Sequence, residues 1–523
     1  MPLSGKQRTA AELGVPEQFN AATWFVDRHS SEGRGDKIAI ECSDERVTYT
    51  ELAERVNRCG SALRDACGVQ RGERVMLLLH DGPAFFYAFF GAIKIGAVPI
   101  PANTLWTTAD YRYVLADSGA RVLIASDALL PLVEAIPRAE LPALRHVIGT
   151  GRGGTFDRLL ARATATLDAA DTRHDAPAFW LYSSGSTGAP KGCVHLQHDM
   201  VVCATLFGMG VLGIRESDRC FSAPKLFFAY GLGNAGYFPL AVGATSVLWP
   251  GPPAAADVFA VIERHRPTLF FFVPTGYGMM LARAGAFDLS SIRLASSAGE
   301  ALPSSLYARF KDRFGIDILD GIGSTEILHT FISNRVGAIR PGSSGRLVDG
   351  YEAALLNEHQ QPVEVGEIGN LFIRGDSVCD GYWNQPEKTQ QTFHDGWMRT
   401  GDKYTQDADG FYWYAGRTDD MLKVGGLWVS PIEVENALIE HEAVQECAVI
   451  GREDADTLVK PMAFVVVREG WTRTPELATA LQTFVRSRLA EYKRPRWVQF
   501  LDALPKTPTG KIQRFKLRAP PSA

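Results

Sequence analysis

The chain has 523 residues, 46% hydrophobic and 22% charged, with a formal net charge of −5. At roughly 150 residues per domain, this length predicts about three structural units of ordinary globular composition. The small net charge, without a basic stripe, argues against a nucleic-acid partner, and no run approaches the ~20 apolar residues of a membrane span.

The first part of the chain alternates helix-like and strand-like segments. Thr50 is predicted to cap a helix whose apolar face carries Leu52 and Val56, and another helix pattern starts at Pro83. Apolar, strand-like runs occupy residues 74–79, 97–100, 121–125 and 268–273. Such βα alternation predicts a mostly parallel sheet covered by helices.

The pattern changes twice towards the C-terminus. From Gly342 it shows short strands and turns, as at residues 366–373, which predicts a β-rich subdomain. After Arg417 it predicts an α+β unit with helices at 432–439 and 475–489 and strands at 447–450 and 463–467. We therefore predict an α/β fold with two domains. A large N-terminal domain, residues 1–416, contains βα-layered sheets and the β-rich subdomain, and a small α+β domain spans residues 417–523.

Eight cysteines are scattered through the chain without a CxxC pair or clustered histidines. Such usage indicates reduced thiols rather than a disulfide framework or a zinc site. The first fifteen residues are polar and lack the apolar core of a signal peptide. Together these features predict a cytoplasmic protein.

Residues 182–192, YSSGSTGAPKG, form the most informative segment. Three glycines let the backbone turn its N–H groups towards an anion, four hydroxyl side chains add donors, and Lys191 adds a positive charge. This combination suits a triphosphate, although it is not the Walker A pattern G-x-x-x-x-G-K-[ST]. The alternative interpretation of such a segment, taken alone, is a simple Gly/Ser-rich surface turn.

This loop resembles the ATP loop of the adenylate-forming superfamily, which includes acyl-CoA synthetases, luciferases and peptide-synthetase adenylation domains. Further segments resemble the other motifs of that superfamily in the same order: GIGSTE at 321–326, TGD at 400–402, GRTDDMLK at 416–423 and PKTPTGK at 505–511. Five motifs in one order make chance a poor explanation. Ile322 departs from the pattern, because many members have an aromatic residue there, so an aliphatic pocket wall is expected.

The resemblance implies an enzyme that joins a carboxylic acid to coenzyme A. The acid would attack the α-phosphate of ATP, and the acyl-AMP product would then react with coenzyme A. Glu326 would bind Mg²⁺, which prefers hard oxygen ligands. The implied catalytic residues are Lys511, Lys191, Glu326 and Thr325.

The same resemblance implies a larger set of contacts with ATP and coenzyme A. The predicted residues are Ser183, Ser184, Gly185, Ser186, Thr187, Gly188, Lys191, Gly299, Glu300, Asp320, Gly321, Thr325, Asp402, Arg417, Gly425 and Gly426. Gly425 and Gly426 would line a pantetheine tunnel, with a simple turn as the alternative. Asp419 occupies the hinge position, about which the C-terminal domain would rotate as a mobile lid between the two half-reactions.

Residues 225–234, KLFFAYGLGN, lie where the superfamily recognises its acid. Compact aromatic surfaces suit a planar ring. With GSTEILH at 323–329, the segment looks like the benzoate–CoA ligase branch, including its hydroxybenzoate relatives, which predicts benzoate or a hydroxy-, amino- or fluoro-benzoate as the acid. The predicted acid-binding residues are Phe228, Ala229, Tyr230, Ser297, Ile322, Gly323 and His329. For His329, a purely structural role is an equally weighted alternative.

Two related activities remain as alternatives: a medium-chain fatty acid–CoA ligase and a stand-alone aryl-acid adenylating enzyme. A peptide-synthetase adenylation domain is disfavoured, because residues 222–240 contain no Asp or Glu to bind an amino group. A non-catalytic nucleotide sensor would need a lost motif, and none is lost. The predicted partners are small molecules only, and the protein is predicted to be a monomer or a homodimer.

Overall fold

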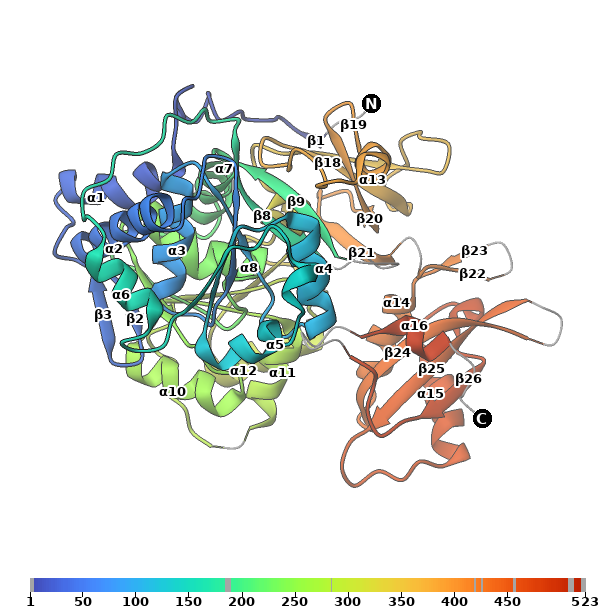
Figure 1. Cartoon of the computed structure of the whole chain (residues 1–523). Coiled ribbons are helices and arrows are strands. Elements are labelled where there is room, and N and C mark those ends of the chain that lie inside the picture. The colour runs from blue at the N-terminus through green and yellow to red at the C-terminus, as the bar shows by residue number, and fades with distance from the viewer. Residues whose placement is uncertain are drawn as a thin grey trace.

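In the computed structural model, the described residues are 4–183, 190–283, 285–417, 420–424, 427–454, 458–506 and 512–518. Within them, a nine-stranded sheet occupies the centre of the N-terminal part (Figure 1). Its inner strands β2, β11, β10, β12, β13 and β14 pair in parallel. The strand order is β16 (Arg346–Leu347), β15 (Thr330–Ser333), β14 (Ile318–Gly323), β13 (Leu294–Ser297), β12 (Leu269–Phe272), β10 (Arg219–Ser222), β11 (Thr245–Leu248), β2 (Ile38–Cys42) and β3 (Glu45–Thr48).

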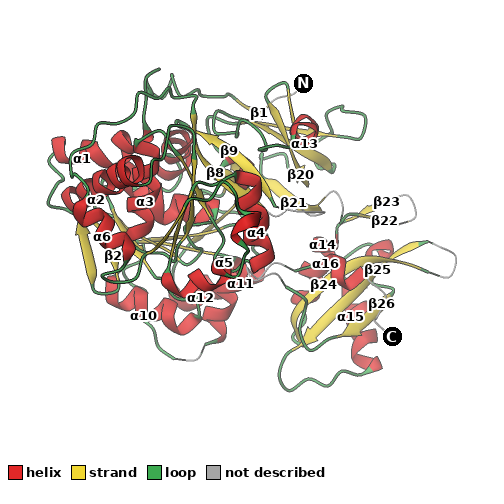
Figure 2. Cartoon of the chain, in the orientation of Figure 1, coloured by secondary structure: helices red, strands yellow, loops and turns green. Residues whose placement is uncertain are grey.

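A smaller sheet accompanies it, and all four of its described strands are parallel. Their order is β5 (Val98–Pro101), β4 (Arg74–Leu78), β6 (Val122–Ala125) and β7 (His146–Gly149). Helices lie around the strands in Figure 2; among them are α2 (Tyr49–Ser61), α3 (Pro83–Lys94), α10 (Ala255–His265), α11 (Pro274–Ala282) and α12 (Ser304–Phe314). The predicted layered α/β architecture is confirmed.

The start of α2 corrects the sequence analysis. The helix is capped by Thr48 rather than Thr50: Glu51 N donates to the Thr48 hydroxyl at 3.2 Å, and Thr48 N donates to the Glu51 carboxylate at 2.8 Å. This reciprocal pair needs a Glu or Gln three residues after the cap, and Ala53 follows Thr50 at that spacing. The predicted core face was right, because Leu52 is fully buried.

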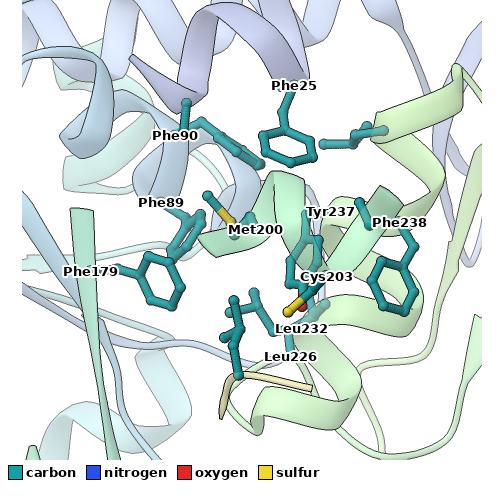
Figure 3. Close-up of a cluster of buried hydrophobic side chains, with 14 of the residues drawn as sticks. Phe25, Phe89, Phe90, Phe179, Met200, Cys203, Leu226, Leu232, Tyr237 and Phe238 are labelled. Atoms are coloured by element: carbon teal, nitrogen blue, oxygen red, sulfur yellow. The ribbon is translucent and has the colours of Figure 1, made fainter. Parts of the chain in front are cut away.

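An aromatic cluster joins the two sheets (Figure 3). The Phe89 ring of α3 packs edge-on against Phe179, with ring centroids 5.4 Å apart, and Phe25 packs against both Phe90 and Tyr237. All five rings are at most 2% exposed. Because Phe179 belongs to β8 (Pro177–Ser183), this packing fixes the strand that enters the predicted phosphate loop.

The predicted β-rich subdomain forms an antiparallel sheet. Its strands are β1 (Ser4–Gly5), β17 (Glu352–Leu356), β18 (Gly369–Arg374), β19 (Phe393–His394), β20 (Trp397–Gln406) and β21 (Tyr412–Arg417). The strand predicted at 366–373 begins only at Gly369, because Gly366 has a φ of +87° and lies in a turn.

The C-terminal part has a core of its own, centred on Val434, Val449, Val465 and Leu481. It lies beside the larger body in Figure 1 and contains β22 (Leu422–Val424), β23 (Leu427–Val429), α14 (Pro431–Ile439), β24 (Val444–Glu453), β25 (Val459–Val467), α15 (Pro475–Arg486), β26 (Trp497–Phe500) and α16 (Arg514–Arg518). Helix α15 ends three residues before the predicted end at 489. No helix in the described ranges is long and apolar enough to cross a bilayer.

Candidate active site

The predicted phosphate loop connects two antiparallel strands. Strand β8 ends at Ser183 and β9 (Lys191–Leu196) begins at Lys191, and these two residues are paired in register. The predicted residues Ser184, Gly185, Ser186, Thr187 and Gly188 lie outside the described residues. The hairpin thus brings the two ends of the motif face to face.

Lys191 lies against the Glu326 carboxylate. Its ammonium is 3.0 Å from Glu326 Oε1, and the two side chains are only 14% and 12% exposed. Glu326 belongs to a 3-10 turn, η7 (Thr325–Ile327), that follows β14. Burial acts to raise the pKa of Glu326, but the Lys191 charge and the hydrogen bonds to the carboxylate together outweigh it, so the pKa lies below its ordinary value and the carboxylate is ionised.

Tyr382 joins this pair, and the sequence analysis missed it. Its hydroxyl accepts a hydrogen bond from Lys191 Nζ at 2.6 Å and donates one to Glu326 Oε1 at 2.9 Å. Tyr382 stands between β18 and α13 (Pro386–Thr392), 191 residues from Lys191 in sequence. Its neighbours carry no spacing pattern that would have revealed the contact.

His195 is a second residue that the sequence analysis missed. Its ring Nε2 donates to the Thr325 carbonyl at 2.8 Å, and its Nδ1 lies 2.8 Å from Asp199 Oδ2. Both side chains are fully buried. Because side chains alternate along a strand, His195 faces the same side of β9 as Lys191, and this alternation is a signal in the sequence that could have found it.

Asp402 and Arg417, both predicted to contact ATP, lie side by side. They are paired in register on β20 and β21, and Arg417 Nη1 lies 3.0 Å from Asp402 Oδ1. Arg417 also donates to the Thr400 carbonyl at 3.3 Å. The Thr-Gly-Asp motif and the start of the hinge motif are therefore adjacent in the fold.

The residues predicted to frame adenine lie where β13 and β14 end. Gly299 has a φ of +88°, in the region that favours glycine, and Glu300 accepts a hydrogen bond from Thr275 at 2.9 Å. A Cβ at Gly321 would come within 2.7 Å of the Ile332 carbonyl. Gly321 therefore has little room for a larger side chain, whereas Gly299 is exposed.

Asp320 supports this turn from a buried position. Leu302 N donates to its carboxyl at 3.3 Å, and Ser297 lies opposite it in the β13–β14 register. Burial raises the pKa of Asp320 to about 8. At neutral pH the carboxyl is therefore mostly protonated, and it serves this loop as a neutral group.

The predicted acid pocket is built around His329 and Tyr230. His329 Nε2 lies 3.3 Å from the Tyr230 carbonyl, and the two rings are 5.4 Å apart. Burial lowers the pKa of His329 to about 3, so its ring is neutral. The Tyr230 hydroxyl donates to Ser296 at 3.2 Å.

Small residues flank these rings. A Cβ at Gly323 would lie 2.6 Å from the His329 carbonyl, and Ala229 begins a short helix, α8 (Ala229–Gly231). Ile322 is partly buried, and the Phe228 ring lies 4.3 Å from the Phe227 ring. The structure thus brings the predicted acid-binding residues of two distant motifs together, while their contact with the acid stays a prediction.

Four predicted residues fall outside the described ranges: Lys511, Asp419, Gly425 and Gly426. Among the described residues, no group of three His, Cys, Asp or Glu side chains forms a metal cluster. Glu326 is a single ionised carboxylate, which fits a Mg²⁺ ion whose other ligands are phosphate oxygens and water.

Two family models match the chain. The AMP-binding enzyme model covers residues 27–383, and the AMP-binding enzyme C-terminal domain model covers residues 433–511. The matched ranges contain the phosphate loop, Glu326, Tyr382 and Lys511. Between them lies the segment with Asp402, Arg417 and the predicted hinge.

Three proteins of known kind resemble the chain over nearly its whole length. A benzoate–CoA ligase from Thauera aromatica is 50% identical over 99% of both chains. The crystal structure of the anthranilate CoA ligase AuaEII with anthranoyl-AMP matches with a TM-score of 0.93 at 45% identity, covering 98% of each chain. A benzoate CoA ligase structure from Burkholderia xenovorans LB400 matches with a TM-score of 0.89 at 46% identity, covering 96% of this chain and 100% of that one.

Proposed function

The chain belongs to the AMP-binding enzyme family, and we propose that it joins benzoate, or a hydroxy-, amino- or fluoro-benzoate, to coenzyme A. The reaction proceeds through an acyl-AMP intermediate and releases AMP and pyrophosphate. The observation that carries this proposal is the full-length likeness to benzoate–CoA ligase, at 50% identity with no motif lost. ATP and coenzyme A are its other substrates.

Adenylation brings two anions together, so the site must provide cations and donors where charge accumulates. A carboxylate oxygen forms a bond to the α-phosphorus, and the bond from that phosphorus to the pyrophosphate oxygen breaks. We assign Lys191 to the departing phosphates and Lys511 to the acid carboxylate and α-phosphate. Thr325 donates its hydroxyl to phosphate, while Asp402 accepts from the ribose hydroxyls and Arg417 assists there.

Mg²⁺ is part of the same proposal. Bound to ATP, it would supply positive charge that neutralises the phosphate oxygens. Glu326 is the residue that would hold it, because the ionised carboxylate lies beside Lys191, at the start of the strand that follows the phosphate loop in sequence. The contacts of Glu326 with Lys191 and Tyr382 keep it there before the nucleotide binds.

Thioester formation needs a different arrangement around the same carbonyl. The thiolate sulfur of coenzyme A attacks the acyl carbon, and the bond from that carbon to AMP breaks. We propose that residues 417–523 rotate about Asp419 relative to residues 1–416, which withdraws Lys511 and brings Gly425 and Gly426 to the pantetheine. All eight cysteines are free thiols, which supports a reducing, cytoplasmic location for this chemistry.

An aromatic acid is favoured by the composition of the predicted pocket. Tyr230 and the neutral His329 ring are 5.4 Å apart, and Gly323 packs closely against the His329 backbone, where a Cβ would lie 2.6 Å from the carbonyl oxygen. A planar ring of limited size matches such walls better than a flexible alkyl chain does.

A substrate panel tests the proposal. Benzoate, its hydroxy, amino and fluoro derivatives, and octanoate are compared by AMP release that depends on coenzyme A. We expect the highest kcat/KM for a benzoate. Preference for octanoate would replace the proposal with the medium-chain alternative, and acyl-AMP formation without thioester would favour the stand-alone adenylating enzyme.

A further inference from the structure

Residues 379–383 run between two parts of the site. Cys379 N donates to the Glu326 carbonyl at 2.8 Å, and Trp383 N donates to Gly192 O, on β9, also at 2.8 Å. The segment is therefore attached both to the residue that carries the carboxylate and to the strand that carries Lys191. This attachment fixes the position of the Tyr382 side chain between Glu326 and Lys191.

The Tyr382 ring is held from its other side as well. Its backbone N donates to Thr389 Oγ1 at 3.0 Å, its ring packs 5.3 Å from the Phe393 ring, and the residue is only 6% exposed. A side chain fixed in this way loses little further freedom when its hydroxyl binds a partner. It is suited to holding another group in place.

The hydroxyl acts as a donor. An ionised carboxylate has no hydrogen to donate, so the hydrogen between the Tyr382 hydroxyl and Glu326 Oε1 belongs to the tyrosine. Its single hydrogen points to Glu326 Oε1, while its lone pairs accept from Lys191.

Within the described part of the chain, the side chains of Lys191 and Tyr382 hold the Glu326 carboxylate, and Lys191 is the cation of the two. Under the proposed function, the phosphates of ATP compete for Lys191, whereas a neutral hydroxyl has little attraction for them. A buried carboxylate without partners is costly and tends to take up a proton. We propose that Tyr382 is a positioning residue that keeps Glu326 oriented for the divalent metal ion of ATP while Lys191 binds phosphate.

The proposal rests on the proposed function and is tested by binding rather than turnover. ATP binding to Tyr382→Phe is measured calorimetrically without acid, with Mg²⁺ and with EDTA. We expect affinity with Mg²⁺ to fall about tenfold, the scale of one hydrogen bond to a charged group, while affinity in EDTA is retained. Tyr49→Phe is the matched control, because it removes a buried hydroxyl bonded to the Ala244 carbonyl at 2.7 Å, and both affinities should stay unchanged.

A double-mutant cycle separates positioning from general damage. In a Glu326→Gln background, Tyr382→Phe should have no further effect on the response to Mg²⁺, because the carboxylate that it positions is gone. Equal losses with and without Mg²⁺, or additive losses in the double variant, would overturn the proposal. If the unmodified protein does not bind ATP, the proposed function fails instead.

A second variant covers the case in which Tyr382→Phe does not fold. Thr389→Val removes the acceptor of the Tyr382 backbone N and keeps the tyrosine itself. It should show the same Mg²⁺-specific loss to a smaller extent. If Tyr382→Phe does not fold, unchanged Mg²⁺ dependence in a folded Thr389→Val contradicts a positioning role.

Discussion

Lys191 and Glu326 form a nearly buried ion pair with a separation of 3.0 Å. Replacing Lys191 by Gln should reduce acyl-AMP formation about a hundredfold or more, the scale of losing one charge-stabilising group. It should also leave the buried carboxylate with its Tyr382 hydrogen bond but without the Lys191 charge, which costs about 1–3 kcal/mol of stability at neutral pH. Pyrophosphate release and urea unfolding measure the two effects.

The pH dependence of this variant has a definite sign. In the unmodified protein the pKa of Glu326 is lowered, so the pair stabilises the fold above the unfolded pKa of about 4.3 and this contribution is lost as pH falls. Lys191→Gln should remove it and raise the pKa of Glu326. Lys493→Gln, which breaks the 2.6 Å pair with Glu433 in the C-terminal part, is the control and should leave adenylation intact.

The predicted site residues that lie in contiguous motifs could be identified from the sequence. Motifs that resemble those of the superfamily contain Lys191, Glu326, Asp402 and Arg417. The structure pairs Lys191 with Glu326 and Arg417 with Asp402. The βα alternation similarly predicted the parallel sheets, because a helix between two strands carries the chain back across the sheet, so that the next strand runs in the same direction. Strand and helix ends were less predictable, as the cap at Thr48 shows, since ends depend on single side-chain hydrogen bonds.

Residues that work only through tertiary contacts escaped prediction. The Tyr382 hydroxyl contacts Lys191, which is 191 residues away in the sequence. The His195 ring, on β9, contacts the Thr325 carbonyl, on η7. Local spacing does not encode the Tyr382 contact, because it depends on β9 and the 379–383 segment lying side by side. For His195, the alternation along β9 indicates the face of the strand but not the Thr325 carbonyl that the ring contacts. Such contacts become visible only in three dimensions.

Lys511 is predicted to serve adenylation alone, from its place in the PKTPTGK motif. Lys511→Ala should slow acyl-AMP formation by roughly two or more orders of magnitude. Thioester formation from supplied benzoyl-AMP should survive, because the thiolate attack does not need this cation. Single-turnover assays of each half-reaction give the comparison, and equal loss in both would rule out the assignment.

Asp419 is predicted to be the pivot between the two half-reactions. Proline at this position fixes φ near −65° and removes a backbone donor, which should block the rotation. Asp419→Pro should therefore still form acyl-AMP but fail to transfer the acyl group to coenzyme A. Measured thioester turnover at the unmodified rate would show that the pivot lies elsewhere.

Asp320 should impose a distinct pH dependence on stability. Its folded pKa, raised to about 8, lies above the unfolded value of about 3.9, so between these values the folded state holds a proton that the unfolded state has released. Stability should therefore fall as pH rises through this window, by up to about 1.4 kcal/mol per pH unit from this group. Asp320→Asn should remove that slope in urea unfolding between pH 5 and about 8, and an unchanged slope would contradict the assignment.

Ala229 is predicted to limit the size of the aromatic acid. It stands at the start of α8 beside Tyr230, whose carbonyl contacts His329, and Gly323 lies against the His329 backbone. Leucine at 229 adds about three methylene-sized groups, and such overpacking costs typically ~1–3 kcal/mol. If residue 229 lines the acid site, Ala229→Leu should raise KM for benzoate about 5- to 150-fold.

The KM for ATP provides the internal control. It should barely move in Ala229→Leu, because the predicted nucleotide contacts at Lys191, Asp402 and Arg417 lie on other elements. Para-substituted benzoates should suffer most if Ala229 forms the pocket floor, and meta-substituted ones if it forms the side wall. Ala229→Gly should shift tolerance towards larger substituents at the same ring position. A folded Ala229→Leu with unchanged aryl KM and substituent preference would place the residue outside the acid site.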